Sequence, residues 1–186
     1  DWNGDFYQGK GVYSLPHPIQ PKMPIINAAG SEEGRVFAMR NADFLFTPVF
    51  DFDQAKATVT DITERASSVN RKVDVLTLCT VVCRPTQQEA EDYLHWYADE
   101  QADWGAVDNL MTLQGMHAQS FTPEALALYR DRMAAGHGGF PLVGTPDTIA
   151  DLLEKLSETG VAGTTLAFVD YAKEFPYFRQ EVLPRL

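Results

Sequence analysis

Apolar runs typical of strands alternate with helical patterns along this chain, and this alternation restricts the fold more than any other feature. The runs lie at residues 24–29, 43–47, 73–83 and 164–169. Such alternation is typical of parallel strands, because a parallel neighbour is reached only through a long crossover. The runs are mostly apolar, as expected for a sheet covered on both faces. The sequence therefore predicts an α/β fold of four strand–helix units with an enlarged third crossover.

Helix start and stop signals divide the segments between these runs. Ser31 is a helix N-cap with two acidic residues in its first turn, and Thr145-Pro146-Asp147 combines a cap, a proline and an acid. Helices are expected after Ser31 and at residues 53–69, 87–104, 122–135, 145–160 and 175–183. Closely spaced prolines predict an extended N-terminal segment over residues 1–22, and residues 105–119 are expected to be irregular.

Charge and cysteine content restrict the partners and the compartment. The formal net charge is −11 at pH 7, and no basic cluster interrupts the acidic surface. Nucleic acid and membrane surfaces are therefore not expected partners, and no apolar run approaches the roughly 18–20 residues that cross a bilayer. Cys79 and Cys83 lie on one face of the third strand, too far apart for a disulfide. Two free thiols indicate a cytoplasmic protein.

A flavodoxin-like open sheet is the main alternative on pattern alone. Such a sheet usually carries a glycine-rich phosphate loop after its first strand. Residues 30–34, Gly-Ser-Glu-Glu-Gly, are only a weak version of that loop. The strand–helix pattern by itself leaves both architectures open.

Five segments in order resemble the bacterial luciferase-like flavin monooxygenase family. They are the Asp-Trp-Asn-Gly-Asp-Phe-Tyr of residues 1–7, the strand-to-helix turn of residues 29–38, the strand of residues 41–46, the Leu-Val-Gly-Thr-Pro of residues 142–146 with its helix, and residues 165–171 followed by the Val-Leu-Pro of residues 182–184. Each motif alone is weak, but the order and spacing hold over nearly all 186 residues. The most similar subgroup contains pyrimidine-oxygenase-like and alkanesulfonate-monooxygenase-like members.

The resemblance implies a TIM-type (β/α)8 barrel of which this chain is the C-terminal half. The four strands would be the fifth to eighth, and residues 1–186 would form one partial domain without the N-terminal half. The chain opens at Asp1 rather than at a methionine, so we expect the natural start to lie upstream. A half barrel leaves two strand edges open. The expected protein partners are therefore the missing barrel half or further copies of this chain in a homo-oligomer.

The turn at Gly30 and Ser31 is the best candidate for a cofactor site. Backbone N–H groups at a helix N-terminus favour an anion, and Gly30 lets the backbone come close to it. From the residues alone, a plain helix cap is the simplest interpretation of Ser31. The resemblance implies instead that Gly30 and Ser31 bind the phosphate of FMN, which requires Glu32 and Glu33 to point away.

Two further segments are candidates for substrate contacts. In alkanesulfonate-type relatives the region matching residues 136–140 is a mobile lid over the flavin, and its glycines here suit a hinge with His137 as a substrate contact. An ordinary loop is the alternative. Asp170 and Tyr171 end the last strand, where barrel enzymes place their active sites, so Tyr171 is a second candidate contact. A capping aromatic is the alternative role of Tyr171.

The third strand departs from the alkanesulfonate pattern. Leu78 and Thr80 stand where those relatives place an arginine and a histidine, and neither side chain can neutralise a sulfonate. A sulfonate substrate is therefore not expected. No metal site and no catalytic residue are assigned, because in flavin enzymes the cofactor carries the chemistry and the first half of the barrel would supply the main catalytic groups.

The resemblance thus implies an FMN-dependent monooxygenase. Reduced FMN, supplied by a separate flavin reductase, would react with O2 and oxidise a small organic substrate. Two alternatives stay open. One is a relative that transfers a hydride with a deazaflavin, in which Ser31 would still hold a phosphate. The other is a half barrel that associates with a partner without catalysis.

Overall fold

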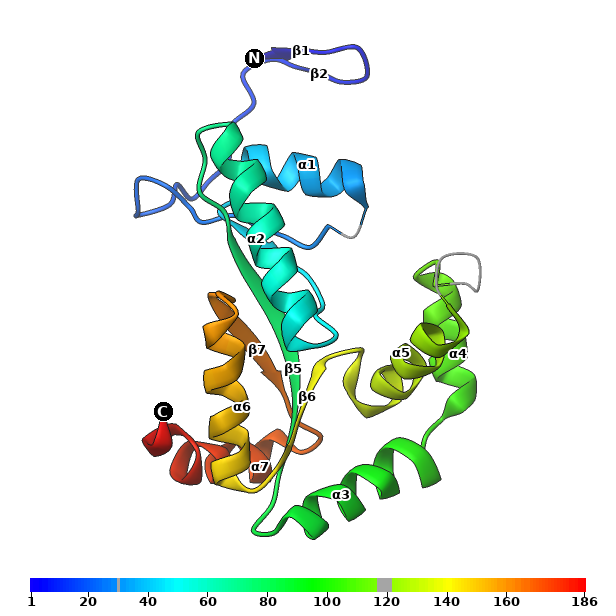
Figure 1. Ribbon diagram of the computed structural model, residues 1–186. Helices are drawn as coiled ribbons and strands as arrows, with labels where there is room; N and C mark the ends of the chain where they lie inside the picture. The colour runs from blue at the N-terminus through cyan, green and yellow to red at the C-terminus, as the bar shows by residue number, and fades with distance from the viewer. Residues whose placement is uncertain (30, 117–121) are drawn as a thin grey trace.

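A parallel sheet organises the molecule, which is described by a computed structural model over residues 1–29, 31–116 and 122–186 (Figure 1). Its five strands are β3 (Ile26–Asn27), β4 (Phe44–Phe46), β5 (Asp74–Cys83), β6 (Phe140–Gly144) and β7 (Gly163–Ala167). Every pairing among them is parallel. The predicted α/β fold with parallel strands is confirmed.

Strand β5 is the centre of this sheet because both of its edges are paired. Leu76 of β5 pairs with β4 on one side and with β7 on the other, and Cys79 pairs with both β6 and β7. A strand has only two edges, so β4 and β6 occupy the same edge of β5, one after the other. Strand β7 occupies the opposite edge.

Helices cover one face of the sheet. They are α1 (Glu32–Asn41), α2 (Phe52–Ser68), α6 (Pro146–Glu158) and α7 (Tyr171–Glu181), followed by a 3-10 turn at Leu183–Arg185. Cys79 and Val81 of β5 are buried in one cluster with Ala55, Ile149 and Phe178 of three of these helices. Burying the larger of these side chains, those of Val81, Ile149 and Phe178, stabilises the fold by roughly 1.5–3 kcal/mol each. Residues of β5 on the alternate face, such as Thr80 and Val82, point away from this core.

The segment between β5 and β6 forms a helical insertion on the other side of the sheet from α6 (Figure 1). It contains α3 (Gln87–His95), a π-helical turn η1 (Trp96–Glu100), α4 (Trp104–Leu113) and α5 (Pro123–Gly136). A cluster of its own, built on Val107, Met111, Tyr129 and Met133, holds α4 against α5. Among the helices that the structure describes, none has both the length and the apolar character to cross a membrane.

The start of the insertion differs from the sequence prediction. The helix expected at residues 87–104 ends in the π-helical turn, and a new helix, α4, lies where an irregular segment was expected. Asp103 is the N-cap of α4, and its Oδ1 accepts a hydrogen bond from Ala106 N at 3.0 Å. The signal was present in the sequence, since Val107 and Met111 follow the cap at helical spacing.

Strand β6 was not predicted. Its second residue, Pro141, has no N–H to donate to a sheet, and Pro141 pairs opposite Thr80 on an edge strand where no second neighbour needs that donor. The last helix was predicted from residue 175 but begins at Tyr171, because Asp170 caps it by accepting from the N–H groups of Ala172 and Lys173. The expected strand at 24–29 is reduced to Ile26–Asn27.

Residues 1–22 contain no helix, as their prolines predicted, but they bend repeatedly rather than forming one extended segment. They hold a two-stranded antiparallel hairpin of β1 (Trp2–Asn3) and β2 (Gln8–Gly9), which lies beyond the end of the sheet (Figure 1).

The two cysteines give a test of the core. Both thiols are free and buried, and burial raises the pKa of each to about 11 from 9.0. Because the thiolate is the nucleophile, we expect the native chain to react with iodoacetamide far more slowly than the urea-unfolded chain, followed by mass spectrometry. Equal reaction rates before and after unfolding would contradict this core.

The same two thiols predict a pH dependence of stability. Because their pKa values are raised on folding, the free energy of unfolding should fall as pH rises from 9.0 towards 11.

Candidate functional site

Ser31 begins α1 directly after the carboxyl end of β3. Its backbone is extended, with φ −82° and ψ 160°, and its Oγ accepts a hydrogen bond from Gly34 N at 3.1 Å. The predicted N-cap is confirmed. A Cβ at Gly34 would lie 2.8 Å from the Cβ of Ala29, so glycine allows the first turn of α1 to approach the end of β3 closely. Gly30, the other predicted phosphate contact, lies outside the described residues.

The two acidic side chains after Ser31, Glu32 and Glu33, differ in their contacts. The carboxylate of Glu32 forms an ion pair with Arg65 of α2, and that hydrogen bond lowers the pKa of the Glu32 carboxyl. Arg65 is also bonded to Asp61 at 3.2 Å, so it holds Glu32 towards α2. Glu33 is exposed. A phosphate at Ser31 requires Glu32 to point away from the turn, and the ion pair with Arg65 holds Glu32 towards α2.

Two buried polar atoms near this turn have no hydrogen-bond partner among the described residues. They are Oδ1 of Asn27, in β3, and Nε of Arg35, in the first turns of α1. Arg35 N also donates to the Ser31 carbonyl at 2.9 Å, which closes the first helical turn. An unpaired guanidinium donor beside a helix N-terminus suits an anionic group such as a phosphate. Arg35 was not among the residues selected from the sequence. The signal available there was a cation one turn after the N-cap.

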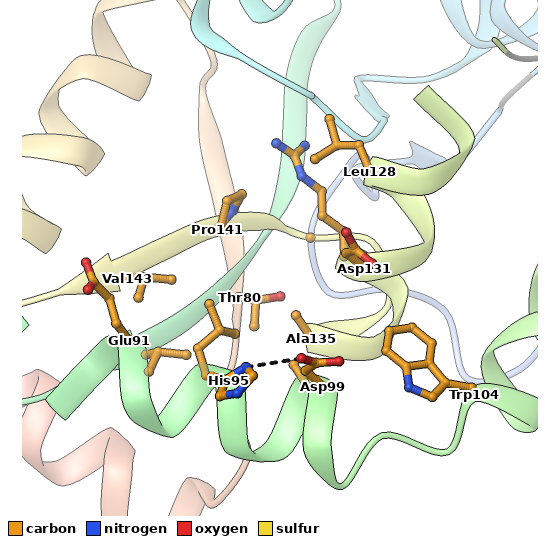
Figure 2. A pocket seen from close by; sticks show the side chains of 15 residues that line it. Thr80, Glu91, His95, Asp99, Trp104, Leu128, Asp131, Ala135, Pro141 and Val143 are labelled. Atoms are coloured by element: carbon orange, nitrogen blue, oxygen red, sulfur yellow. Dashed lines mark ion pairs between the residues drawn. The ribbon is translucent and has the colours of Figure 1, made fainter. Parts of the chain in front are cut away.

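A cavity of about 530 Å³ lies between the inner face of the sheet and the helical insertion (Figure 2). Thr80 and Val82 of β5, together with Pro141 and Val143 of β6, form its sheet side. The opposite sides come from α3, η1, Trp104 and α5. Of the residues discussed from the sequence, Thr80 is part of this lining, whereas Ser31, His137 and Tyr171 are not.

Thr80 joins the sheet to the end of α5. Its Oγ1 donates to the carbonyl oxygen of Gly136 at 3.1 Å. A Cβ at Gly136 would lie 2.4 Å from Thr80 Oγ1, and one at Gly139 would lie 2.6 Å from the same atom. These two glycines are therefore explained by close packing on Thr80.

The glycine-rich segment forms a tight helix-to-strand turn. His137 adopts the left-handed conformation with φ 56°, and Gly138 N donates back to the Arg132 carbonyl at 3.0 Å. This is a common way to end a helix. Gly138 and Gly139 are buried, whereas the His137 side chain is exposed. The structure thus has a short turn in the segment for which the sequence left a lid hinge and an ordinary loop open.

Tyr171 lies in the first turn of α7. Its hydroxyl donates to the Leu166 carbonyl at 3.3 Å, and its ring packs edge-on against Phe168 at 5.4 Å between centroids. These contacts fit the capping aromatic that the sequence left as an alternative. The ring is still 57% exposed, so it also remains accessible at the end of β7.

A charged contact joins the carboxyl ends of β5 and β7. Arg84 donates to Glu174 at 2.6 Å, and its guanidinium lies 3.9 Å from the ring centre of Tyr93 in α3. Glu174 also accepts from the N–H groups of Val169 and Asp170 at 3.0 and 3.1 Å. Arg84 and Glu174 thereby fix α3 to the turn after β7. They lie 90 residues apart in the sequence, so no local pattern could have paired them.

The sequence of this chain matches those of known flavin-dependent monooxygenases. The sequence model of luciferase-like monooxygenases matches residues 1–163. The chain is 30% identical over 190 residues to an FMNH(2)-dependent dimethylsulfone monooxygenase of Pseudomonas fluorescens (strain Pf0-1), covering 98% of this chain and 51% of the relative. It is 29% identical over 217 residues to the dimethyl-sulfide monooxygenase of Hyphomicrobium sulfonivorans, covering 98% of this chain and 45% of the relative.

Solved structures show the same fold. The crystal structure of DmoA from Hyphomicrobium sulfonivorans superposes with a TM-score of 0.73 at 24% identity, over 97% of this chain and 46% of that one. A riboflavin lyase crystallised with modified FMN and riboflavin superposes with a TM-score of 0.81 at 21% identity, over 99% of this chain and 47% of that one.

The chain belongs to the luciferase-like monooxygenase family. Its fold is the C-terminal half of a luciferase-like TIM-type barrel, as the resemblance implied. The chain spans about half the length of the curated relatives it matches.

The packing on Thr80 can be tested with glycine substitutions. In Gly139→Ala the new Cβ would lie 2.6 Å from Thr80 Oγ1 and 3.0 Å from Thr80 N. We expect a loss of about 1–3 kcal/mol in the free energy of unfolding, as for other overpacked sites, measured by urea denaturation. The matched control is Gly105→Ala in α4, where the nearest atom is 3.5 Å away. Alanine there should stabilise by about 0.5–1 kcal/mol. Similar effects at both positions would contradict the packing described.

Proposed function

We propose that this chain is the C-terminal half of an FMN-dependent monooxygenase that oxidises a small organic substrate with O2. The Ser31 turn carries the proposal, because it presents a helix N-terminus and an unpaired Arg35 donor while Arg65 holds Glu32 towards α2. The similarity to FMNH(2)-dependent relatives over 98% of the chain supports reduced FMN as the cofactor.

The residues present fit the phosphate of FMN. Ser31 and the free N–H groups of the first turn of α1 would hold it, Gly30 would allow its close approach, and the Arg35 guanidinium would balance its charge. When bound, reduced FMN supplies the electrons that activate O2. The relatives are FMNH(2)-dependent, which supports flavin that arrives already reduced, so we propose a separate flavin reductase as its source.

Residues 1–186 form one partial domain in this proposal, and we propose that the first half of the barrel pairs with its open strand edges. Among the described residues β3 pairs only with β4, and β7 only with β5. Ile25 and Ile26 next to the first of these edges are 49% and 58% exposed. The proposed partner is a segment or chain that supplies the first four strand–helix units, with association of further copies of this chain as the alternative.

We also propose substrate contacts for His137 and Tyr171 and a cytoplasmic location. His137 and Tyr171 are exposed and do not line the cavity, so a substrate role for either requires the substrate to extend past the ends of α5 and β7. The buried free thiols of Cys79 and Cys83 support a cytoplasmic location.

The phosphate role of Ser31 can be separated from its role as a helix cap. Ser31→Ala removes both the cap and the hydroxyl, whereas Ser31→Asp keeps a good cap and adds a negative charge. We expect Ser31→Asp to weaken FMN binding at least about tenfold, because a carboxylate a few ångströms from a phosphate repels it strongly. Binding would be measured by flavin fluorescence titration, on this chain alone and combined with a chain that carries the first four units.

The matched controls are Thr145→Ala and Thr145→Asp. Thr145 is likewise an N-cap, with its Oγ1 accepting from Thr148 N at 3.2 Å, but it begins α6. These variants should change stability by about 1 kcal/mol or less and leave FMN affinity unchanged. Unaltered FMN binding in Ser31→Asp would rule out the phosphate role. Binding of a deazaflavin in place of FMN would favour the hydride-transfer alternative, and binding of neither would favour a non-catalytic half barrel.

A further inference from the structure

The cavity between the sheet and the insertion is lined by residues of β5, β6 and the helical insertion. For brevity we call it the inner cavity, with the lining given above (Figure 2). Its volume of about 530 Å³ lies within the range of roughly 300–1,000 Å³ that is usual for small-molecule sites. In a complete barrel the face of β5 that carries Thr80 and Val82 points inwards, towards the active site. The inner cavity is therefore placed to receive a substrate.

The walls of the inner cavity are apolar. The sheet side presents Val82, Pro141 and Val143, and the helices add leucine and alanine side chains together with the Trp104 ring. Thr80 is the hydroxyl on the sheet side, and its hydrogen is already donated to Gly136. Such walls exclude water and gain free energy from contact with apolar groups, at about 25 cal/mol per Å² of buried area.

Negative charge surrounds the opening. Glu91, Asp99 and Asp131 line the cavity, and all three are exposed, so they lie at its rim (Figure 2). Nδ1 of His95, which also lines the cavity, lies 3.1 Å from Oδ2 of Asp99, and Glu91 accepts a hydrogen bond from Gln87 at 2.8 Å. An anion that enters this opening would approach carboxylates while losing its hydration, and both effects oppose binding.

The arginine in the lining has most of its donors engaged. The terminal nitrogens of Arg132 donate to the carbonyl oxygens of Val49 and Phe50, in the loop after β4, at 3.3 and 2.7 Å, and its buried Nε has no partner among the described residues. Desolvation lowers the pKa of its guanidinium, which shows the cost of holding the cation in these surroundings. A cationic ligand would lose hydration against the same apolar walls, with the carboxylates at the rim rather than at the base.

The π-helical turn gives the helical wall its shape. At Trp96–Glu100 the extra residue per turn places Ala98 and Asp99 against the cavity. Ala98 is buried and presents only a methyl group to the cavity. The side chain of Asp99 is exposed and lies at the rim. Turns of this kind are rare, cost stability and occur frequently at functional sites.

We propose that the inner cavity binds the organic substrate and selects uncharged, largely apolar molecules against anions such as sulfonates and carboxylates. This names the substrate class of the proposed monooxygenase and so rests on the proposed function. The apolar walls and the carboxylate rim both point to the same class. Leu78 and Thr80 on the same face of β5 agree with it, since neither can neutralise an anion.

A pair of fluorescent probes that differ by one sulfonate tests this selectivity. N-phenyl-1-naphthylamine is uncharged, and 8-anilino-1-naphthalenesulfonate has the same ring skeleton with an anionic group. Energy transfer that is lost in Trp104→Phe, with Trp2 and Trp96 left in place, would report binding in the inner cavity. We expect the uncharged probe to bind at least about tenfold more tightly, because the sulfonate must approach the carboxylate rim. Equal affinity, or tighter binding of the anionic probe, would overturn the proposed selectivity.

Two variants locate the probe. Val143→Phe extends a side chain into the inner cavity and should weaken binding of the uncharged probe at least about tenfold, since a filled site loses its apolar contact area. The control is Val169→Phe, where the valine is 48% exposed and lies outside the lining. Asp131→Asn removes one rim charge and should narrow the difference between the probes roughly two- to fivefold. Its control is Glu124→Gln, an exposed residue in the first turn of the same helix.

Circular dichroism and an FMN titration on each variant separate the outcomes. If Val143→Phe fails to fold, the probe pair and the Asp131 variant on the folded chain still decide the question. Retained FMN binding with no effect of Val143→Phe or Asp131→Asn would overturn the inner cavity as the substrate site and leave the proposed function standing. Loss of FMN binding in every form, with probe selectivity as expected, would reject the flavin function and retain a site for uncharged molecules.

Discussion

Hydrogen bonding along both edges of β5 determines how the rest of the chain is arranged. One edge is shared by β4 near its start and β6 near its end, and the other is taken by β7. Because side chains alternate along the strand, Cys79 and Val81 reach the helix-covered core while Thr80 and Val82 reach the inner cavity. A shift of one residue in this pairing would exchange the two sets, so the same register secures both the core and the site.

Local signals in the sequence were sufficient where the cause is local. Ser31 and Thr145 were recognised as caps because an N-cap depends on the residue itself and on the next turn of chain. Strand β6 was missed because Pro141 and Gly144, with φ 147°, have the chemistry of a turn. Only pairing with β5 makes that segment a strand. The bond between Arg84 and Glu174 likewise depends on the folded sheet and has no sequence signature.

The candidate site was predicted unevenly for the same reason. The turn proposed to hold a phosphate was predicted because it coincides with a cap, although Arg35 and the Arg65–Glu32 pair were not anticipated. The inner cavity was not predicted, because its walls come from the interior face of β5, an unpredicted strand and a helix interrupted by a π-helical turn. Each wall is unremarkable in sequence and becomes a cavity only when the insertion lies over the sheet.

The insertion leaves the sheet after Cys83 and rejoins it at Phe140, which pairs with Cys79, four residues earlier on β5. Cys83 pairs with Gly144 in the last rung of β5 and β6, and Arg84 N donates to the Gly144 carbonyl at 3.0 Å. Residues 84–139 therefore begin and end on the neighbouring strands β5 and β6, and they lie outside the strands β3 and β4 that support α1. Such a connection is a natural point of evolutionary exchange. The chemistry that acts on a molecule can be kept while the choice of molecule is rewritten.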